Sequence, residues 1–120
     1  MTDKLVELVS RVEKKSISDA LAWEVTANPD EFQTILASFV VRIREHFEAG
    51  DSLPDYEIKI IGANGNTLET ISNGDLVNIL HGNEIEGRHP YAVMKSIFTK
   101  AKRQALGVDK AIDNILSELE

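Results

Sequence analysis

The residues best suited to chemistry lie in one short polar stretch between residues 81 and 89. It holds two histidines and two glutamates: His81, Glu84, Glu86 and His89. Imidazole nitrogens and carboxylate oxygens both bind zinc and related divalent metals. Because no regular element is expected to fix their spacing, the simpler interpretation is a solvated loop with unrelated charges. We therefore treat the four as metal-ligand candidates but predict no metal site.

Other signatures of catalysis are missing from the sequence. The chain has no cysteine, which excludes disulfides, thiol catalysis and cysteine-ligated zinc. The segment 62–65, Gly-Ala-Asn-Gly, is explained by a hairpin turn and not by a phosphate-binding loop. His46 is interpreted as a half-exposed strand residue and not as a catalytic base. We predict that the protein is not an enzyme and uses no cofactor.

Composition places the chain among small acidic globular proteins. Its 120 residues predict a single domain, residues 1–120, and its net charge is −7. That charge argues against a nucleic-acid ligand, because the phosphate backbone would be repelled, and it suits a basic protein partner. The charged start and the lack of a long apolar run predict no signal peptide, no membrane segment and a cytoplasmic protein.

The first quarter of the chain predicts one helix and one strand. Thr2 is expected to cap a helix from Asp3 to about Lys15, with the apolar stripe Leu5, Leu8, Val9 and Val12. Alternating apolar residues predict a strand over 21–27, in which Trp23 is interpreted as a core residue.

Two interpretations compete for residues 28–50. Asn28-Pro29-Asp30-Glu31 has the form of a helix start, helical spacing follows from Phe32 to Phe47, and Gly50 could end that helix. In contrast, residues 39–44 are β-branched in part and alternate with period two, as in a strand. Local rules lean slightly towards the helix.

Residues 56–71 give the clearest local signal, a hairpin. Two alternating segments, 56–61 and 67–71, flank Asn64-Gly65, a preferred two-residue turn. Such a turn pairs Ile61 with Leu68 and Ile58 with Ile71. Residues 72–88 are then rich in Gly, Asn and Asp, and we predict a long loop there, which could contain one helical turn.

The end of the chain predicts one long amphipathic helix after Pro90. Steps of three and four residues reach an uninterrupted apolar stripe: Tyr91, Met94, Phe98, Ala101, Ala105, Val108, Ile112, Ile115 and Leu119. Because this phase continues through Gly107, we expect the glycine not to end the helix. The stripe is expected to bury against a sheet.

Charge along this predicted helix is segregated in the sense opposite to the helix dipole, basic before Gly107 and acidic after it. Antiparallel pairing with a second copy, basic half against acidic half, is one explanation. The simpler one is that both halves are solvated and the stripe is used inside one monomer. The partner-binding candidates are Lys95, Lys102, Arg103, Asp109, Asp113 and Glu118.

Three pieces taken together resemble a group of small uncharacterised bacterial proteins. They are the segment 23–26 (Trp-Glu-Val-Thr), the hairpin through Gly65, and residues 101–109 leading into the apolar end of the chain. The group is similar in having a Trp-containing strand, a Gly-turned hairpin and a terminal helix of Ala-Arg-Arg, Gly-Val-Asp type. The resemblance covers about residues 20–120 and implies that Phe32 and the segment 41–43 lie in strands, which we adopt. It implies no activity.

The predicted fold class is α+β, an antiparallel sheet of about three to five strands carrying an N-terminal and a long C-terminal helix. The expected function is that of a non-catalytic protein-binding module: an inhibitor, an immunity protein or a regulator acting by surface contact. Alternatives are a structural module that dimerises through the last helix, a metal-dependent enzyme using residues 81–89, and nucleic-acid binding through Lys95, Lys100, Lys102 and Arg103.

Overall fold

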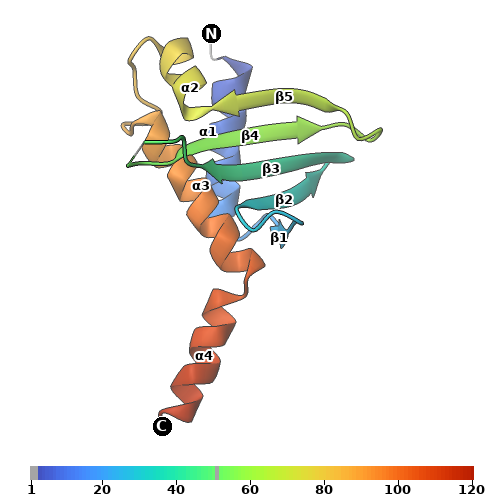
Figure 1. The fold of residues 1–120 in the computed structure, drawn as a ribbon, viewed down its shortest axis with the longest axis vertical. Coiled ribbons are helices and arrows are strands. Elements are labelled where there is room, and N and C mark those ends of the chain that lie inside the picture. Colours follow the sequence, from blue (N-terminus) through green and yellow to red (C-terminus); the bar gives the residue numbers. More distant parts are fainter. Residues whose placement is uncertain (1–2, 51) are drawn as a thin grey trace.

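A five-stranded antiparallel sheet organises the protein, with strands in the order β1-β2-β3-β4-β5. The computed structural model describes residues 3–50 and 52–120. Helices α1 and α3 lie behind the sheet in Figure 1. This arrangement confirms the predicted α+β class. The elements are α1 (Lys4–Ile17), β1 (Glu24–Val25), β2 (Glu31–Leu36), β3 (Phe39–His46), β4 (Asp55–Ile61), β5 (Thr67–Ser72), α2 (Asn73–Leu80), α3 (Pro90–Ala105) and α4 (Val108–Glu118).

The core lies between the sheet and α3. One row of paired residues crosses four strands and is fully buried: Phe32, Ile43, Ile58 and Ile71. The Phe98 ring of α3 packs on this layer, with its centroid 5.6 Å from that of Phe32 and 5.5 Å from that of Tyr56. Such tilted aromatic contacts stabilise a core beyond the area that they bury.

Tyr56 combines this apolar packing with one polar contact. Its hydroxyl donates a hydrogen bond to Oε2 of Glu45 at 2.9 Å. Burial, with the neighbouring carboxylate of Glu45 as a further cause, raises the pKa of the Tyr56 hydroxyl well above its usual value. The residue therefore stays a neutral donor.

Helix α1 begins one residue later than predicted and ends two residues later. Asp3 is the N-cap, and its side chain accepts a hydrogen bond from the backbone N–H of Leu5 at 2.8 Å. The predicted cap, Thr2, lies outside the described residues. Val9 and Val12 of the predicted stripe are buried, and the helix packs mainly along α3.

Trp23 is a core residue, as predicted, but it lies just before β1, which covers only two residues of the predicted strand 21–27. Its indole N–H donates to Oγ of Ser16 at 3.0 Å, and its backbone N–H donates to the side chain of Gln104 at 2.8 Å. Trp23 thus connects the end of α1 to the end of α3. The strand is limited to Glu24 and Val25, which pair with Gln33 and Phe32 of β2.

Residues 31–46 form two strands, as the resemblance implies, and the helix favoured by local rules is wrong. The strands turn at Ala37 and Ser38, which have φ angles of +50° and +70°. Two residues of positive φ make the tight hairpin turn that matches strand twist, usually with Asn or Gly. The chain accepts this strain because Phe32 and Ile43 then face the core.

The β4–β5 hairpin is present with a modified register. Ile58 pairs with Ile71 as predicted, but Ile61 pairs with Thr67 and not with Leu68. The turn spans residues 62–66, since the Gly62 N–H donates to the carbonyl of Asn66 at 2.9 Å. A turn longer than the predicted two residues creates a bulge, which leaves Leu68 exposed.

The stretch predicted as a loop over 72–88 contains α2, a helix of 8 residues. Ser72 and Asp75 form a capping box, each side chain accepting from the other's backbone N–H. Leu76 of this helix is fully buried, so tertiary contact stabilises what the glycine and asparagine content disfavours.

A long C-terminal helix packs on the sheet as predicted, but the prediction that it continues through Gly107 is wrong, because the helix ends there. Helix α3 ends at Ala105, and Gly107 has a left-handed φ of +64° before α4 begins. A glycine in this conformation just after a helix is a common termination signal. The break also removes the conflict with the helix dipole, because Lys102 and Arg103 now end one helix and Asp109 begins the next.

Candidate protein-interaction surfaces

Helix α4 projects away from the rest of the molecule (Figure 1). None of its residues is buried. The apolar stripe predicted to pack on the sheet is open to solvent, with Ile115 at 58%, Leu116 at 57% and Leu119 at 75% exposed. Contiguous exposed apolar side chains of this kind are typical of interaction sites.

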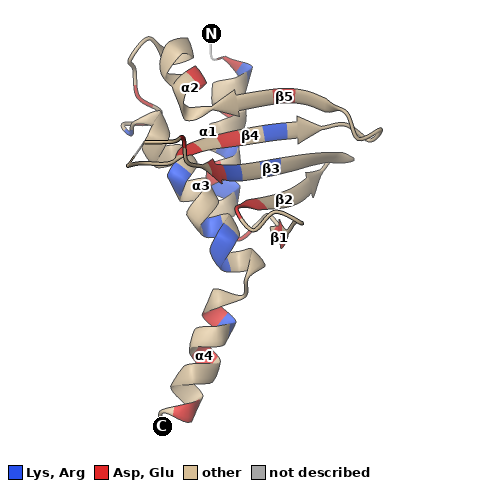
Figure 2. Ribbon diagram, viewed as in Figure 1, with Lys and Arg blue, Asp and Glu red and all other residues tan. Residues whose placement is uncertain are grey.

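Acidic side chains flank this apolar stripe. On a helix of 3.6 residues per turn, Asp113 lies on one side of the stripe and Glu118 on the other, while Asn114 lies on the opposite face. In Figure 2 the charged segments of α4 are mainly acidic (red), whereas those in the second half of α3 are basic (blue). The surface of a partner that binds α4 should therefore be apolar with a basic rim.

The predicted partner-binding residues are all exposed but do not form one surface. Lys95 and Lys102 lie on α3, and Asp113 and Glu118 lie on α4. Arg103 and Asp109 contact each other across the break, with Nη2 of the arginine 2.7 Å from the carboxylate. Lys100 similarly contacts Asp19 at 3.5 Å. The basic group considered for nucleic acid is thus partly neutralised within the chain.

Antiparallel pairing along the whole predicted helix is excluded in this structure. The seam residues of α3, including Met94, Phe98 and Ala101, are buried within the monomer. They cannot contact a second copy at the same time. The interpretation that the stripe is used inside one monomer is therefore right for α3 and wrong for α4.

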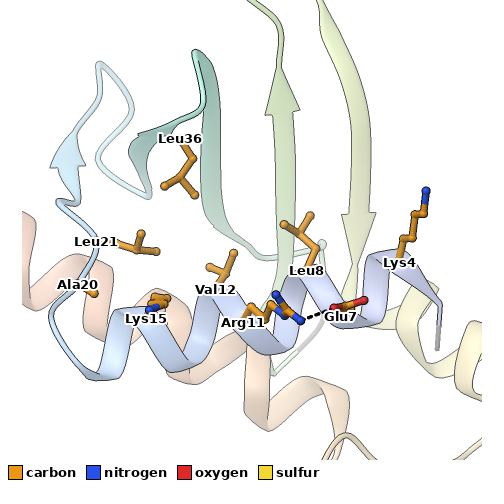
Figure 3. A pocket seen from close by; sticks show the side chains of 9 residues that line it. All are labelled: Lys4, Glu7, Leu8, Arg11, Val12, Lys15, Ala20, Leu21 and Leu36. Carbon is orange, nitrogen blue, oxygen red and sulfur yellow. Dashed lines mark ion pairs between the residues drawn. The ribbon is translucent and has the colours of Figure 1, made fainter.

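A second surface, the α1 groove, was not found from the sequence. It is an open apolar cavity of about 640 Å³ between α1 and the end of β2. In Figure 3, Leu8 and Val12 rise from α1 towards Leu36 of β2, and Leu21 approaches from the side. The lining residues are Lys4, Glu7, Leu8, Arg11, Val12, Lys15, Ala20, Leu21 and Leu36.

The rim of the α1 groove is basic. Lys4, Arg11 and Lys15 recur along one side of α1, and Glu7 is the one acid among the lining residues. Arg11 contacts Glu7 at 2.6 Å in an exposed pair one helical turn apart, a kind of contact that contributes little. The groove therefore combines an apolar floor with a net positive rim.

The metal-ligand candidates are distributed among structural roles. His81 ends α2 in a left-handed conformation, and Glu84 is exposed in the following loop. Nδ1 of His89 accepts a hydrogen bond from the backbone N–H of Tyr91 at 3.1 Å, which caps α3. Among the described residues, no group of three or more metal-ligating side chains is positioned to hold a metal.

Glu86 belongs to a set of ion pairs that joins this loop to α1. Its carboxylate lies 2.6 Å from Nζ of Lys14, and that contact lowers the pKa of Glu86 below its usual value. Next to it, Arg88 contacts the buried Glu13, which raises the pKa of the arginine. The loop thus positions the start of α3.

No protein-family model matches the chain, and the searches of curated proteins and of solved structures found no match either. In the part of the chain that the structure describes, no helix is both long enough and apolar enough to span a bilayer. The structure presents two surfaces suited to protein binding: an exposed helix with an apolar face and acidic flanks, and a separate apolar groove with a basic rim.

Proposed function

We propose that this protein is a non-catalytic protein-binding module that acts by surface contact, as an inhibitor, an immunity protein or a regulator does. Helix α4 is its docking element. The observation that carries the proposal is the exposure of Ile112, Ile115, Leu116 and Leu119 along one face of α4. An amphipathic helix that lays such a face into a groove is a recurrent mode of protein recognition.

The stability of isolated helices supports a binding role for α4. The helix has 11 residues, and helices shorter than about 12–15 residues are marginal in water without tertiary packing. Since α4 buries none of its own residues, a partner that covers its apolar face would supply the missing stabilisation. The acidic flanks favour a partner with basic groups around an apolar groove.

The experiment is affinity capture from a lysate of the source organism with the tagged full chain. The test variant is Ile115→Asp, which places a charge in the exposed apolar face. Asn114→Asp is the matched control, because it adds the same charge on the opposite face of α4. We expect a specific protein to be retained by the wild type and the control and lost by the test variant. The proposal would be contradicted if Ile115→Asp retained the same protein as the wild type, or if the wild type retained no specific protein.

The same exposed face favours a second candidate function, a structural or assembly module that dimerises through α4. Sedimentation velocity tests this second candidate, because a module that dimerises through α4 shows association of the pure protein that depends on concentration.

A further inference from the structure

The α1 groove and α4 are complementary in polarity. The groove offers an apolar floor of Leu8, Val12, Leu21 and Leu36. Helix α4 offers an apolar face that none of the residues described in the structure covers. Each surface lacks the type of contact that the other can supply, and burying both would remove apolar area from water.

The two surfaces also match in length. The groove runs along α1 from Lys4 to Lys15, about 16 Å at the rise of a helix. Helix α4 has 11 residues and is likewise about 16 Å long. A helix of this length can therefore contact the groove from end to end.

Their charges are opposite. The rim has three cations and one acid, Lys4, Arg11 and Lys15 against Glu7. Helix α4 has three acids and one cation, Asp109, Asp113 and Glu118 against Lys110. Because the acids flank the apolar face, they would meet the rim when that face enters the groove, which fixes orientation and suppresses wrong partners.

The chain's own α4 does not occupy its groove. In Figure 1, α4 extends away from the body; it follows Gly107 in its left-handed conformation, and Arg103 contacts Asp109 across the turn. This arrangement concerns only α4 and the body of its own molecule, so it does not prevent α4 of one molecule from reaching the groove of another. A symmetric pair of molecules could insert two helices reciprocally, which doubles the contact area.

We infer that α4 of one copy docks in the α1 groove of a second copy, so that the protein forms a reciprocal homodimer. This inference rests on the proposed role of α4 as a docking element and names its partner. The contact joins Ile112, Ile115 and Leu116 of one copy to Leu8, Val12 and Leu36 of the other. The acidic flanks of α4 lie against Arg11 and Lys15 of the rim.

The test is sedimentation velocity of the full chain from about 1 µM to about 1 mM, a range that covers weak to moderate association. The groove variant is Arg11→Glu with Lys15→Glu, and the helix variant is Asp113→Lys with Glu118→Lys. All four positions are exposed, so the fold should persist. We expect the wild type to dimerise and each variant alone to lose at least tenfold in affinity.

Mixing the two variants gives the decisive result. The reversed groove of one variant then meets the reversed α4 of the other, while the two unchanged surfaces also meet. We expect the equimolar mixture to recover association close to that of the wild type. The matched control, Lys95→Glu with Lys102→Glu, makes the same change in net charge on the exposed side of α3 and should dimerise about as tightly as the wild type.

Several results would overturn the inference. They are a wild type that remains monomeric across the whole range, a groove variant that dimerises like the wild type, and a mixture that does not recover association. Chemical cross-linking that joins α4 to the α1 groove within one monomer would also overturn it. If the wild type is monomeric but Ile115→Asp still abolishes capture of another protein, only self-docking fails; if capture is also unaffected, the proposed function fails with it.

Discussion

Helices α3 and α4 have the same amphipathic phase but opposite environments. The apolar side chains of α3, including Met94, Ile97 and Phe98, are almost fully buried. The continuation of that stripe in α4, including Ile112 and Ile115, is 42% and 58% exposed. The periodicity of the sequence is the same in both, so it cannot be the cause of the difference.

The difference comes from what lies beneath each helix. Helix α3 crosses β1, β2, β3 and β4, and the contact between Trp23 and Gln104 marks the end of that support. Beyond Gly107 the chain has passed the edge of the sheet (Figure 1). Amphipathic spacing thus predicts a helix that needs a cover, but it does not say whether the same chain supplies it.

The largest expected effect is a difference between α3 and α4 in how much an alanine substitution lowers the free energy of unfolding. Phe98→Ala should lower the free energy of unfolding by about 3–5 kcal/mol, because it opens a cavity against Phe32 and Tyr56. Ile115→Ala should change it by no more than about 0.5 kcal/mol in single molecules. Urea unfolding at low protein concentration measures both. Similar losses for the two variants would show that α4 is packed within its own chain.

A second prediction concerns the contact that ends the supported region. Ser16→Ala removes the acceptor of the buried Trp23 indole N–H and should cost about 1–3 kcal/mol. Ser117→Ala, in exposed α4, is the matched control and should be neutral within about 0.5 kcal/mol. Thermal or urea unfolding gives both values, and equal effects would argue against Ser16 as an anchor.

The third prediction tests the break between α3 and α4 by whether a glycine-to-alanine substitution raises or lowers the stability of the protein. Gly107→Ala should destabilise the protein by about 1–2 kcal/mol, because alanine resists a left-handed φ even where space is open. Gly74→Ala, at a helical glycine of α2, should instead stabilise by about 0.4–1 kcal/mol. Stabilisation by both substitutions would indicate one continuous helix through Gly107.

The smallest expected effect is a dependence on pH at the start of α3. Ionised Glu86 is favoured in the folded protein because Lys14 lowers its pKa. Its contribution is therefore complete above the unfolded pKa of about 4.3 and is lost as the pH falls through the lower folded pKa. Glu86→Gln should lower the urea midpoint slightly at neutral pH, and this difference should disappear as the pH falls through the folded pKa. A difference that persists unchanged at acid pH would contradict this origin.

Much of the fold follows from local patterns, and the exceptions have identifiable physical causes. The hairpin around Gly65 and the burial of Trp23 were predictable because turn type and alternation are local signals. The β2–β3 hairpin was not predictable from local rules, since Ala37 and Ser38 are poor residues for positive φ. Tertiary burial of the flanking strands overrides that preference. In contrast, α2 had a readable signal, the capping box of Ser72 and Asp75.

The two candidate surfaces also differ in whether local sequence patterns can predict them. The apolar face and acidic flanks of α4 can be predicted from sequence, because they lie on one helix. The α1 groove cannot, because Leu8 and Leu36 come from separate elements that only the folded sheet brings together. Gly107 could have been interpreted as a helix end from the reversal of charge on its two sides.

Hydrogen exchange measured peptide by peptide over a range of protein concentrations tests the central claim most directly. The claim is that the apolar face of α4 has no cover in a single molecule and is the surface for interaction. At low concentration we predict strong protection of α3 amides and fast exchange throughout α4, with protection of α4 and of the α1 groove rising together as concentration increases. Protection of α4 equal to that of α3 at the lowest concentration, and independent of concentration, would contradict the claim.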